Sequence, residues 1–408
     1  MSSSSRPLRI LLVTPPLTGH LHPALALADE LRGRGHTVAW AGPEPVLRPV
    51  LGPGAEIRPT GSRLFREQAV GGTAAIRTLW RDFVVPYARF TLPALRRAVG
   101  EWRPDVVLVD QHSPGGALAA HLHQVPWAGF APSSMELGRP PGEQPELARW
   151  QEELLRGLWR RAGLPEDDYV DPRYAPGLIL ACTSPALLGA AVPGMPAPGA
   201  DMEPLPPQCV AVGPLLTVRR ENDAGFPWER LRSGRRRVLV TLGTLSASVA
   251  EDFMMRTSAA LTALADRVQA IVAAPPPVLD RMPEHVLGLP RVPVLELLRR
   301  GEVDAVLCHG GMNTVCEALA HGVPLVLAPI RHDQPITADR VASLGAGVRL
   351  DFAAAGPERI GAALRAVLDE PGPARAARLM ASHLAGLGGA SRAADLLERW
   401  AHCAHVPG

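Results

Sequence analysis

One segment of the sequence combines glycines, polar side chains and an expected helix start. It runs His309-Gly310-Gly311-Met312-Asn313-Thr314-Val315-Cys316-Glu317, directly after an apolar run at residues 305–308. The two glycines let the backbone approach a ligand closely, and the first turn of a helix offers free N–H groups and a positive dipole end. Glu317 lies one turn beyond Asn313 on the same face, where a carboxylate can accept hydrogen bonds from ribose hydroxyls. The pattern predicts a cradle for a diphosphate and a ribose, the alternative being an ordinary strand–turn–helix with a capping asparagine.

A second group of residues could carry out acid–base chemistry. The loop Thr18-Gly19-His20-Leu21-His22-Pro23 follows an apolar strand expected at Arg9–Val13, and Asp110 ends another at residues 106–109. Because the carboxyl ends of parallel strands meet at one edge of a sheet, we expect His20 and Asp110 to lie together. A carboxylate beside an imidazole orients it and balances the charge that forms when it takes a proton. His22 is the rival base. We interpret the other histidines of this half as structural or exposed, namely His36, His112, His121 and His123.

The composition limits the class of protein. A chain of 408 residues is long enough for two domains with separate cores. The net charge of +2 indicates no nucleic-acid or anionic-membrane partner. All 42 basic residues are arginine, which excludes a P-loop lysine and Schiff-base catalysis.

The cysteines and the N-terminal segment indicate a compartment. The five cysteines form no CxxC pair, and their odd number argues against a disulfide framework, so a reducing, cytoplasmic location is expected. The apolar run at residues 10–13 is too short for a signal peptide or a membrane span, so no stable membrane insertion is expected.

Apolar runs alternate with helical patterns along both halves of the chain. After the first strand, a helix is expected from near Pro23 to Gly35, followed by a strand at residues 37–41. The second half restarts with strands expected at residues 238–242, 269–273, 305–308 and 324–328. The Pro- and Gly-rich stretch at 191–228 is interpreted as the connection between the halves. The fold class is therefore α/β, with two doubly wound parallel sheets facing across a cleft.

The segment from His309 to Glu317 resembles the nucleotide-sugar signature of the family 1 glycosyltransferases, which include antibiotic, flavonoid and carotenoid glycosyltransferases. Their pattern is His, a small residue, Gly, any residue, Asn, Ser or Thr, two residues of any type, and Glu. This sequence matches every fixed position. The resemblance implies a GT-B fold of two Rossmann-like domains. It places an acceptor-binding domain at residues 1–215, a nucleotide-sugar-binding domain at 216–390, and a C-terminal helix at 391–408 that packs back on the first domain.

The resemblance also implies roles for single residues. His20 would be the general base and Asp110 its partner, and the pair Asp333 and Gln334 would hold the transferred sugar. Gly243 and Thr244 resemble a phosphate turn of the family. The donor-binding residues implied in full are Gly19, Gly243, Thr244, Val292, His309, Gly310, Gly311, Met312, Asn313, Thr314, Glu317, Asp333 and Gln334.

One departure from the family concerns the nucleotide base. Many members place a Trp and a Gln around a Val-Pro pair to stack on and pair with uracil. Here the segment is Arg291-Val292-Pro293-Val294, which lacks both. Backbone recognition at Val292 is one solution, and the choice between uridine and thymidine stays open.

Two segments without a clear sheet pattern, residues 61–95 and 133–174, carry large apolar side chains that suit the walls of an acceptor pocket. Helix faces packed on the domain are the alternative for each of them. The acceptor-binding residues expected are His22, Trp80, Phe83, Tyr87 and Met135. The acceptor implied by the resemblance is polyketide-like, aromatic or carotenoid-like.

Together these features predict an inverting hexosyltransferase of antibiotic or other secondary metabolism, moving a sugar from a UDP- or dTDP-sugar to a hydroxyl of an apolar small molecule. No Asp-x-Asp follows a strand and no His/Cys cluster has metal-ligand spacing, so we expect a metal-independent reaction without a cofactor. The alternatives are a sugar-nucleotide epimerase or hydrolase, and a non-catalytic homologue that binds a sugar nucleotide. The oligomeric state stays open, a homodimer included.

Overall fold

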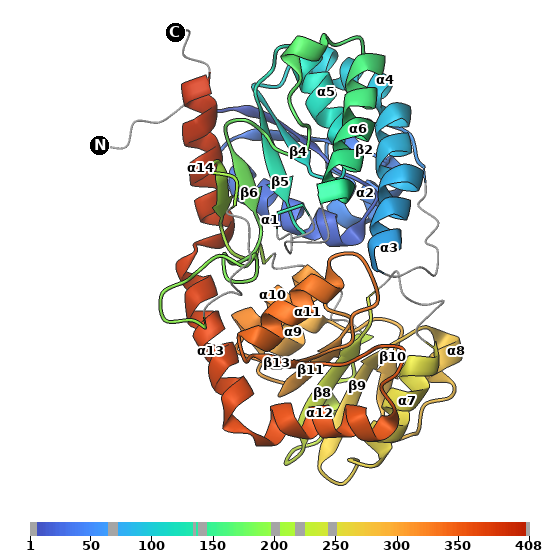
Figure 1. Ribbon diagram of the computed structural model, residues 1–408. Coiled ribbons are helices and arrows are strands. Elements are labelled where there is room, and N and C mark those ends of the chain that lie inside the picture. Colours follow the sequence, from blue (N-terminus) through green and yellow to red (C-terminus); the bar gives the residue numbers. More distant parts are fainter. Residues whose placement is uncertain are drawn as a thin grey trace.

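Two parallel β-sheets, each flanked by helices, form the two domains of the protein (Figure 1). The computed structural model describes residues 6–63, 72–133, 136–137, 145–196, 205–216, 225–243 and 251–404. Among these residues, no helix combines the length and apolarity needed to cross a membrane.

The sheet of the first domain has the order β3-β2-β1-β4-β5-β6-β7, and all its neighbouring strands are parallel. Its central strands are buried on both faces, which explains their continuous apolar runs. The strands are β1 (Arg9–Val13), β2 (Thr37–Gly42), β3 (Ile57–Pro59), β4 (Val106–Asp110), β5 (Trp127–Ala131), β6 (Ile179–Ala181) and β7 (Cys209–Ala211).

The sheet of the second domain has the order β10-β9-β8-β11-β12-β13 and is also parallel throughout. Its strands are β8 (Arg236–Thr241), β9 (Val268–Ala273), β10 (Leu287–Leu289), β11 (Ala305–Cys308), β12 (Leu325–Leu327) and β13 (Gly347–Arg349). The two sheets confirm the predicted fold class of two doubly wound halves.

Helices connect most successive strands and cover the sheet faces (Figure 1). In the first domain they are α1 (Thr18–Gly33), α2 (Glu44–Leu51), α3 (Gly72–Thr78), α4 (Val85–Trp102), α5 (Pro114–Leu122) and α6 (Pro145–Arg161), with a π-helical turn at Leu79–Val84. In the second they are α7 (Glu251–Thr262), α8 (Pro276–Leu279), α9 (Val294–Arg299), α10 (Met312–Ala320), α11 (Gln334–Ser343), α12 (Pro357–Asp369) and α13 (Pro371–Gly386).

Two boundaries differ from the sequence-based expectation. Helix α1 begins at Thr18 and contains Pro23, whereas the proline had been expected at the first helical position. The stretch interpreted as the connection between the domains includes β7, an edge strand of the first sheet. A three-residue strand between prolines carries too little apolar pattern to be recognised, and edge positions tolerate such neighbours.

The last helix, α14 (Gly389–Ala404), crosses back and packs on α1 of the first domain (Figure 1). Leu397 and Ala401 are fully buried in the same core cluster as Leu27 of α1. Polar contacts surround this apolar face: Arg34 pairs with Asp395 at 2.6 Å, and the His36 Nε2 lies 2.9 Å from Glu398.

The packing of α14 predicts that Leu397→Ala destabilises the first domain. Removing a fully buried leucine loses transfer free energy and leaves a cavity, a combination that costs about 2–5 kcal/mol. Chemical unfolding followed by tryptophan fluorescence measures this change. The matched control is Leu379→Ala on α13, where the side chain is 46% exposed and the same substitution should change stability little. Equal effects of the two substitutions would contradict the packing described.

Candidate active site

The predicted catalytic and donor residues lie at the points where the strand order of each sheet reverses. In the first sheet the reversal falls between β1 and β4, and His20 and Asp110 follow these strands. In the second it falls between β8 and β11, which are followed by Gly243 and His309. Such switch points open a crevice beyond the carboxyl ends of the strands, where ligands of open α/β sheets bind.

His20 and Asp110 form a direct hydrogen-bonded pair, as their sequence positions predict. The Nδ1 of His20 lies 2.8 and 3.0 Å from the two carboxylate oxygens of Asp110. Asp110 is fully buried and also accepts a hydrogen bond from the backbone N–H of His112 at 2.9 Å. An ionised carboxylate only accepts hydrogen bonds, so Nδ1 carries the proton. The other ring nitrogen, Nε2, therefore holds the lone pair that a general base needs.

Helix α1 begins earlier than predicted, so Pro23 lies inside its first turns and leaves one backbone carbonyl without a hydrogen-bond partner in the helix. Proline has no backbone N–H, so the carbonyl four residues before it, on Gly19, lacks its helical partner. That carbonyl instead accepts a hydrogen bond from the Nδ2 of Asn313 at 2.6 Å. Asn313 lies in the first turn of α10, so this bond joins the two switch points across the domain boundary.

His309 is packed between two glycines at the end of β11. A methyl group on Gly243 would lie 2.8 Å from its ring, and one on Gly311 would lie 2.5 Å from its Nε2. Burial lowers the pKa of His309 to about 4, and a hydrogen bond with the backbone of Thr241 offsets this only in part. The imidazole is therefore neutral at physiological pH.

The start of α10 has the geometry of an anion site. Gly310 has a φ of 85°, a left-handed conformation that favours glycine, and it turns the chain from β11 into the helix. Gly311 is the N-cap residue, and no side chain caps the helix. The backbone N–H groups of Met312, Asn313 and Thr314 thus lack helical partners and can bind an anion.

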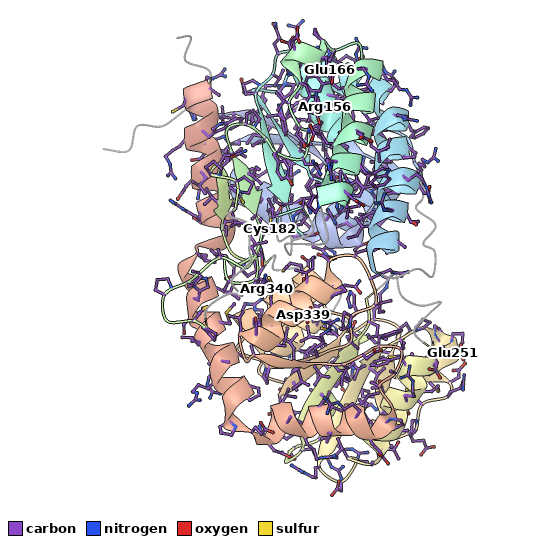
Figure 2. The ribbon with its side chains drawn as sticks, viewed as in Figure 1. Arg156, Glu166, Cys182, Glu251, Asp339 and Arg340 are labelled. Atoms are coloured by element: carbon purple, nitrogen blue, oxygen red, sulfur yellow. The ribbon has the colours of Figure 1, made fainter. Side chains whose placement is uncertain are left out.

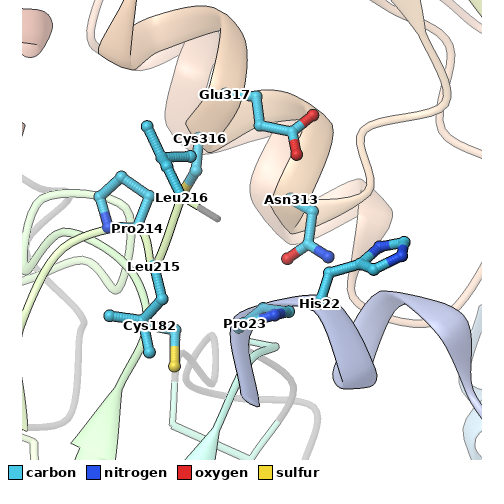
Figure 3. Close-up of a pocket in the computed structure, with 9 residues that line it drawn as sticks. All are labelled: His22, Pro23, Cys182, Pro214, Leu215, Leu216, Asn313, Cys316 and Glu317. Atoms are coloured by element: carbon cyan, nitrogen blue, oxygen red, sulfur yellow. The ribbon is translucent and has the colours of Figure 1, made fainter. Parts of the chain in front are cut away.

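Beside this turn, a pocket lies at the domain boundary, lined by His22, Asn313 and Glu317 together with residues of the first domain (Figure 3). Glu317 is mostly buried on the same face of α10 as Asn313, as its spacing predicts. Cys182 lies at the boundary as well (Figure 2). The sulfur of Met312 accepts a hydrogen bond from the Thr183 hydroxyl of the first domain at 3.1 Å, so this side chain packs at the domain boundary.

The loop between β12 and α11 carries the predicted sugar-binding pair. The side-chain oxygen of Gln334 accepts hydrogen bonds from the backbone of Ile330 and Arg331, at 2.9 and 3.0 Å, so only its NH₂ group is available to a ligand. Asp333 immediately precedes α11 as its N-cap residue. Val292 is half-buried, and its carbonyl accepts a hydrogen bond from Val294 at 2.9 Å, which leaves less of its backbone for a base.

Two histidines near this site were not singled out by the sequence. His112, interpreted as structural or exposed, is buried with its ring centroid 4.8 Å from that of His20. His332 adopts a φ of 58°, rare for a residue other than glycine, and burial lowers its pKa to about 4. The signal for His112 was its place two residues after Asp110 at the end of a strand. The strain at His332 has no sequence signal.

The predicted acceptor-binding aromatic residues belong to a core cluster in the structure. Trp80, Phe83 and Tyr87 are almost fully buried among residues of α4, α5 and α6. The Trp80 indole donates to Glu136 at 3.2 Å, and the Tyr87 hydroxyl donates to the backbone oxygen of Thr14 at 3.4 Å. Their burial corresponds to packed helix faces rather than to walls open to solvent. Met135 and Thr244 lie outside the described residues.

Comparison with known proteins shows the family to which the chain belongs. Residues 203–382 match the family described as "UDP-glucoronosyl and UDP-glucosyl transferase". Over 398 residues the chain is 31% identical to 4'-demethylrebeccamycin synthase from Lentzea aerocolonigenes, covering 89% of this chain and 92% of that protein. The chain belongs to this glycosyltransferase family. The family resemblance of the His309–Glu317 signature is thereby confirmed, and so is the prediction that the protein is a glycosyltransferase.

Solved structures of glycosyltransferases share the fold over nearly their whole length. A glycotransferase of kitacinnamycin has a TM-score of 0.79 and 29% identity, covering 97% of this chain and 99% of that chain. The spinosyn rhamnosyltransferase SpnG, solved with spinosyn aglycone, has a TM-score of 0.74 and 27% identity, covering 96% of this chain and 100% of its own. The same enzyme has also been solved with thymidine diphosphate. These likenesses confirm the predicted GT-B fold.

The contact between Gly311 and His309 predicts that Gly311→Ala weakens binding of a nucleoside diphosphate to this glycosyltransferase. The added methyl group would displace the buried imidazole and the first turn of α10, so affinity should fall about tenfold or more, or at least about 1.4 kcal/mol. Calorimetric titration with UDP and dTDP measures the change. Gly361→Ala is the matched control, because a methyl group there meets only the Arg365 side chain at 3.5 Å. Unchanged affinity in Gly311→Ala would contradict the assignment of this turn.

Proposed function

We propose that this glycosyltransferase moves a hexose from a UDP- or dTDP-sugar to a hydroxyl of an apolar small molecule of natural-product metabolism, with inversion at the anomeric carbon. His20 is the general base, Asp110 orients it, and the reaction needs no metal ion. The observation that carries the proposal is the hydrogen bond between Asn313 and Gly19, because it holds the base and the anion site against each other.

The positions of His20 and of the α10 helix start on different domains support a single-displacement transfer of the sugar. In an inverting transfer, the acceptor hydroxyl attacks the anomeric carbon from the side opposite the leaving diphosphate, so the base and the diphosphate must flank the sugar. His20 lies on the first domain, and the free N–H groups of α10 lie on the second. The His20 Nε2 takes the proton of the acceptor hydroxyl while its Nδ1–H stays bonded to Asp110. The helix N-terminus stabilises the charge that develops on the leaving diphosphate.

The neutral imidazole of His309 fits the same role. A group without charge adds little long-range attraction, and a neutral imidazole has a single N–H, which it can donate either to the Thr241 backbone or to a phosphate oxygen. Its Nδ1 is buried without a hydrogen-bond partner among the described residues, so His309 reaches a phosphate through Nδ1 only in the tautomer that gives up the bond to Thr241. Glu317 lies one turn further along α10 on the same face as Asn313, where its carboxylate can accept hydrogen bonds from ribose hydroxyls.

The proposals for donor and acceptor rest partly on the relatives. A 31% identical relative is 4'-demethylrebeccamycin synthase, and SpnG has been solved with thymidine diphosphate and with spinosyn aglycone. A dTDP-sugar and a hydroxylated aglycone are therefore the first substrates to test. Release of nucleoside diphosphate with and without an acceptor panel separates transfer from hydrolysis, since only transfer requires the acceptor.

The position of His20 predicts that His20→Ala lowers turnover by about 10²–10⁴-fold, because general-base catalysis contributes that much. Affinity for the nucleoside diphosphate should change little, since the donor site lies on the other domain. Steady-state kinetics and calorimetry measure the two quantities separately. His123→Ala, which removes an exposed histidine at the far end of α5, is the control and should keep the original rate. A near-normal rate in His20→Ala would exclude this residue as the base.

The same mechanism predicts that EDTA does not lower turnover. The charge of the leaving diphosphate is stabilised by backbone N–H groups and a histidine, so no cation is required for this step. Initial rates with EDTA and with added Mg²⁺ should be equal. A strict Mg²⁺ requirement would contradict this part of the proposal.

A further inference from the structure

Three side chains with metal-ligating atoms converge beyond the carboxyl ends of β1 and β4. They are the imidazoles of His20 and His112 and the carboxylate of Asp110, and their ligand atoms all lie within 4.8 Å of one another. Asp110 fixes the ring of His20 and the backbone of His112, since it accepts hydrogen bonds from the His20 Nδ1 and from the His112 backbone N–H. The three residues are buried or nearly so, with His20 the most exposed of them.

His112 has no role in the proposed transfer, and its surroundings are unusual. The residue is 3% exposed, and neither ring nitrogen has a hydrogen-bond partner among the residues that the structure describes. Buried polar atoms are nearly always paired, and leaving one unpaired costs free energy. Its ring lies beside that of His20, tilted by 36°. A buried imidazole with free nitrogen atoms next to a second imidazole and a buried carboxylate is arranged to receive a ligand.

We infer that His20, Asp110 and His112 form a site for a divalent transition metal ion, foremost Zn²⁺, and that the bound ion switches off the catalytic base. Two imidazoles and one carboxylate with an open fourth position are a zinc ligand set. Magnesium and calcium prefer oxygen ligands alone, so the two imidazoles select against them. The single negative charge of Asp110 partly compensates the charge of the ion.

The site is nearly, but not fully, assembled. Zinc lies about 2.0–2.2 Å from nitrogen and oxygen ligands, so a tetrahedral set needs ligand atoms roughly 3.3 Å apart. The His20 Nδ1 and the Asp110 oxygen are already 2.8 Å apart and must separate slightly. The ring of His112, which no described residue holds by a hydrogen bond, must rotate toward them.

Metal binding changes the tautomer of His20. The ion takes the lone pair of Nδ1, and the proton that Nδ1 donated to Asp110 moves to Nε2, with no net loss of protons from the ring. Nε2 then carries a hydrogen and cannot accept one from an acceptor hydroxyl. Occupancy of the site thus inhibits transfer. This inhibition rests on the proposed role of His20, whereas the binding of the ion does not.

Metal-free protein titrated with Co²⁺ tests the binding directly. Co²⁺ in a tetrahedral nitrogen and oxygen site absorbs visible light, and Zn²⁺ should displace it and remove the absorption. We expect one equivalent of Co²⁺ per chain in the unchanged protein and in the His123→Ala control. His112→Asn and His112→Gln should lose the absorption while melting cooperatively. The proposal would be overturned if both variants folded and kept the absorption. It would also be overturned if the unchanged protein did not bind Co²⁺ at micromolar concentration.

Kinetics separate this proposal from the proposed function. Zn²⁺ should inhibit sugar transfer by the unchanged enzyme. The His112→Asn variant should need a Zn²⁺ concentration at least about tenfold higher to lose the same fraction of its transfer rate, each rate being compared with that of the same protein without metal. The cobalt absorption without any sugar transfer would support the metal site and refute the function. Sugar transfer that Zn²⁺ inhibits equally in both proteins would refute the metal site and leave the function intact.

Discussion

The hydrogen bond from the Asn313 amide to the Gly19 carbonyl is the contact on which the arrangement of the site depends. It exists because Pro23 lacks a backbone N–H, so the Gly19 carbonyl has no helical partner and faces the second domain. The bond joins the first turn of α1, which carries His20, to the first turn of α10, which carries the free N–H groups. A proline that ordinarily would disturb a helix here provides an acceptor between two domains.

Each domain contributes one half of the chemistry from the same structural position. The switch point of the first sheet supplies an oriented imidazole with a free Nε2, because the buried carboxylate of Asp110 fixes the proton on Nδ1. The switch point of the second sheet supplies an uncapped helix start and a buried neutral histidine. A hydrogen-bond acceptor for the nucleophile and donors for an anionic leaving group thus come from different domains, as the proposed transfer requires.

The region around His20 also contains two histidines that have no role in the proposed transfer. His112 is buried beside His20, His332 is half-buried in the loop between β12 and α11, and the pKa of each is lowered by burial. Such residues reduce stability unless a ligand or function compensates for them. The inferred metal site gives His112 a role as a metal ligand, which is distinct from sugar transfer. The bound ion would make the proposed base, His20, sensitive to trace transition metals.

The sequence by itself determined the two doubly wound domains and the placement of His20, Asp110, His309 and Glu317, because these features follow from local apolar periodicity and from residues at strand ends. It did not determine the start of α1, the edge strand β7 or the burial of Trp80 and Phe83. Those depend on contacts between residues far apart in the chain. Only the tertiary structure decided that Asn313 bonds Gly19 and that His112 lies against His20, since neither contact leaves a periodic pattern in the sequence.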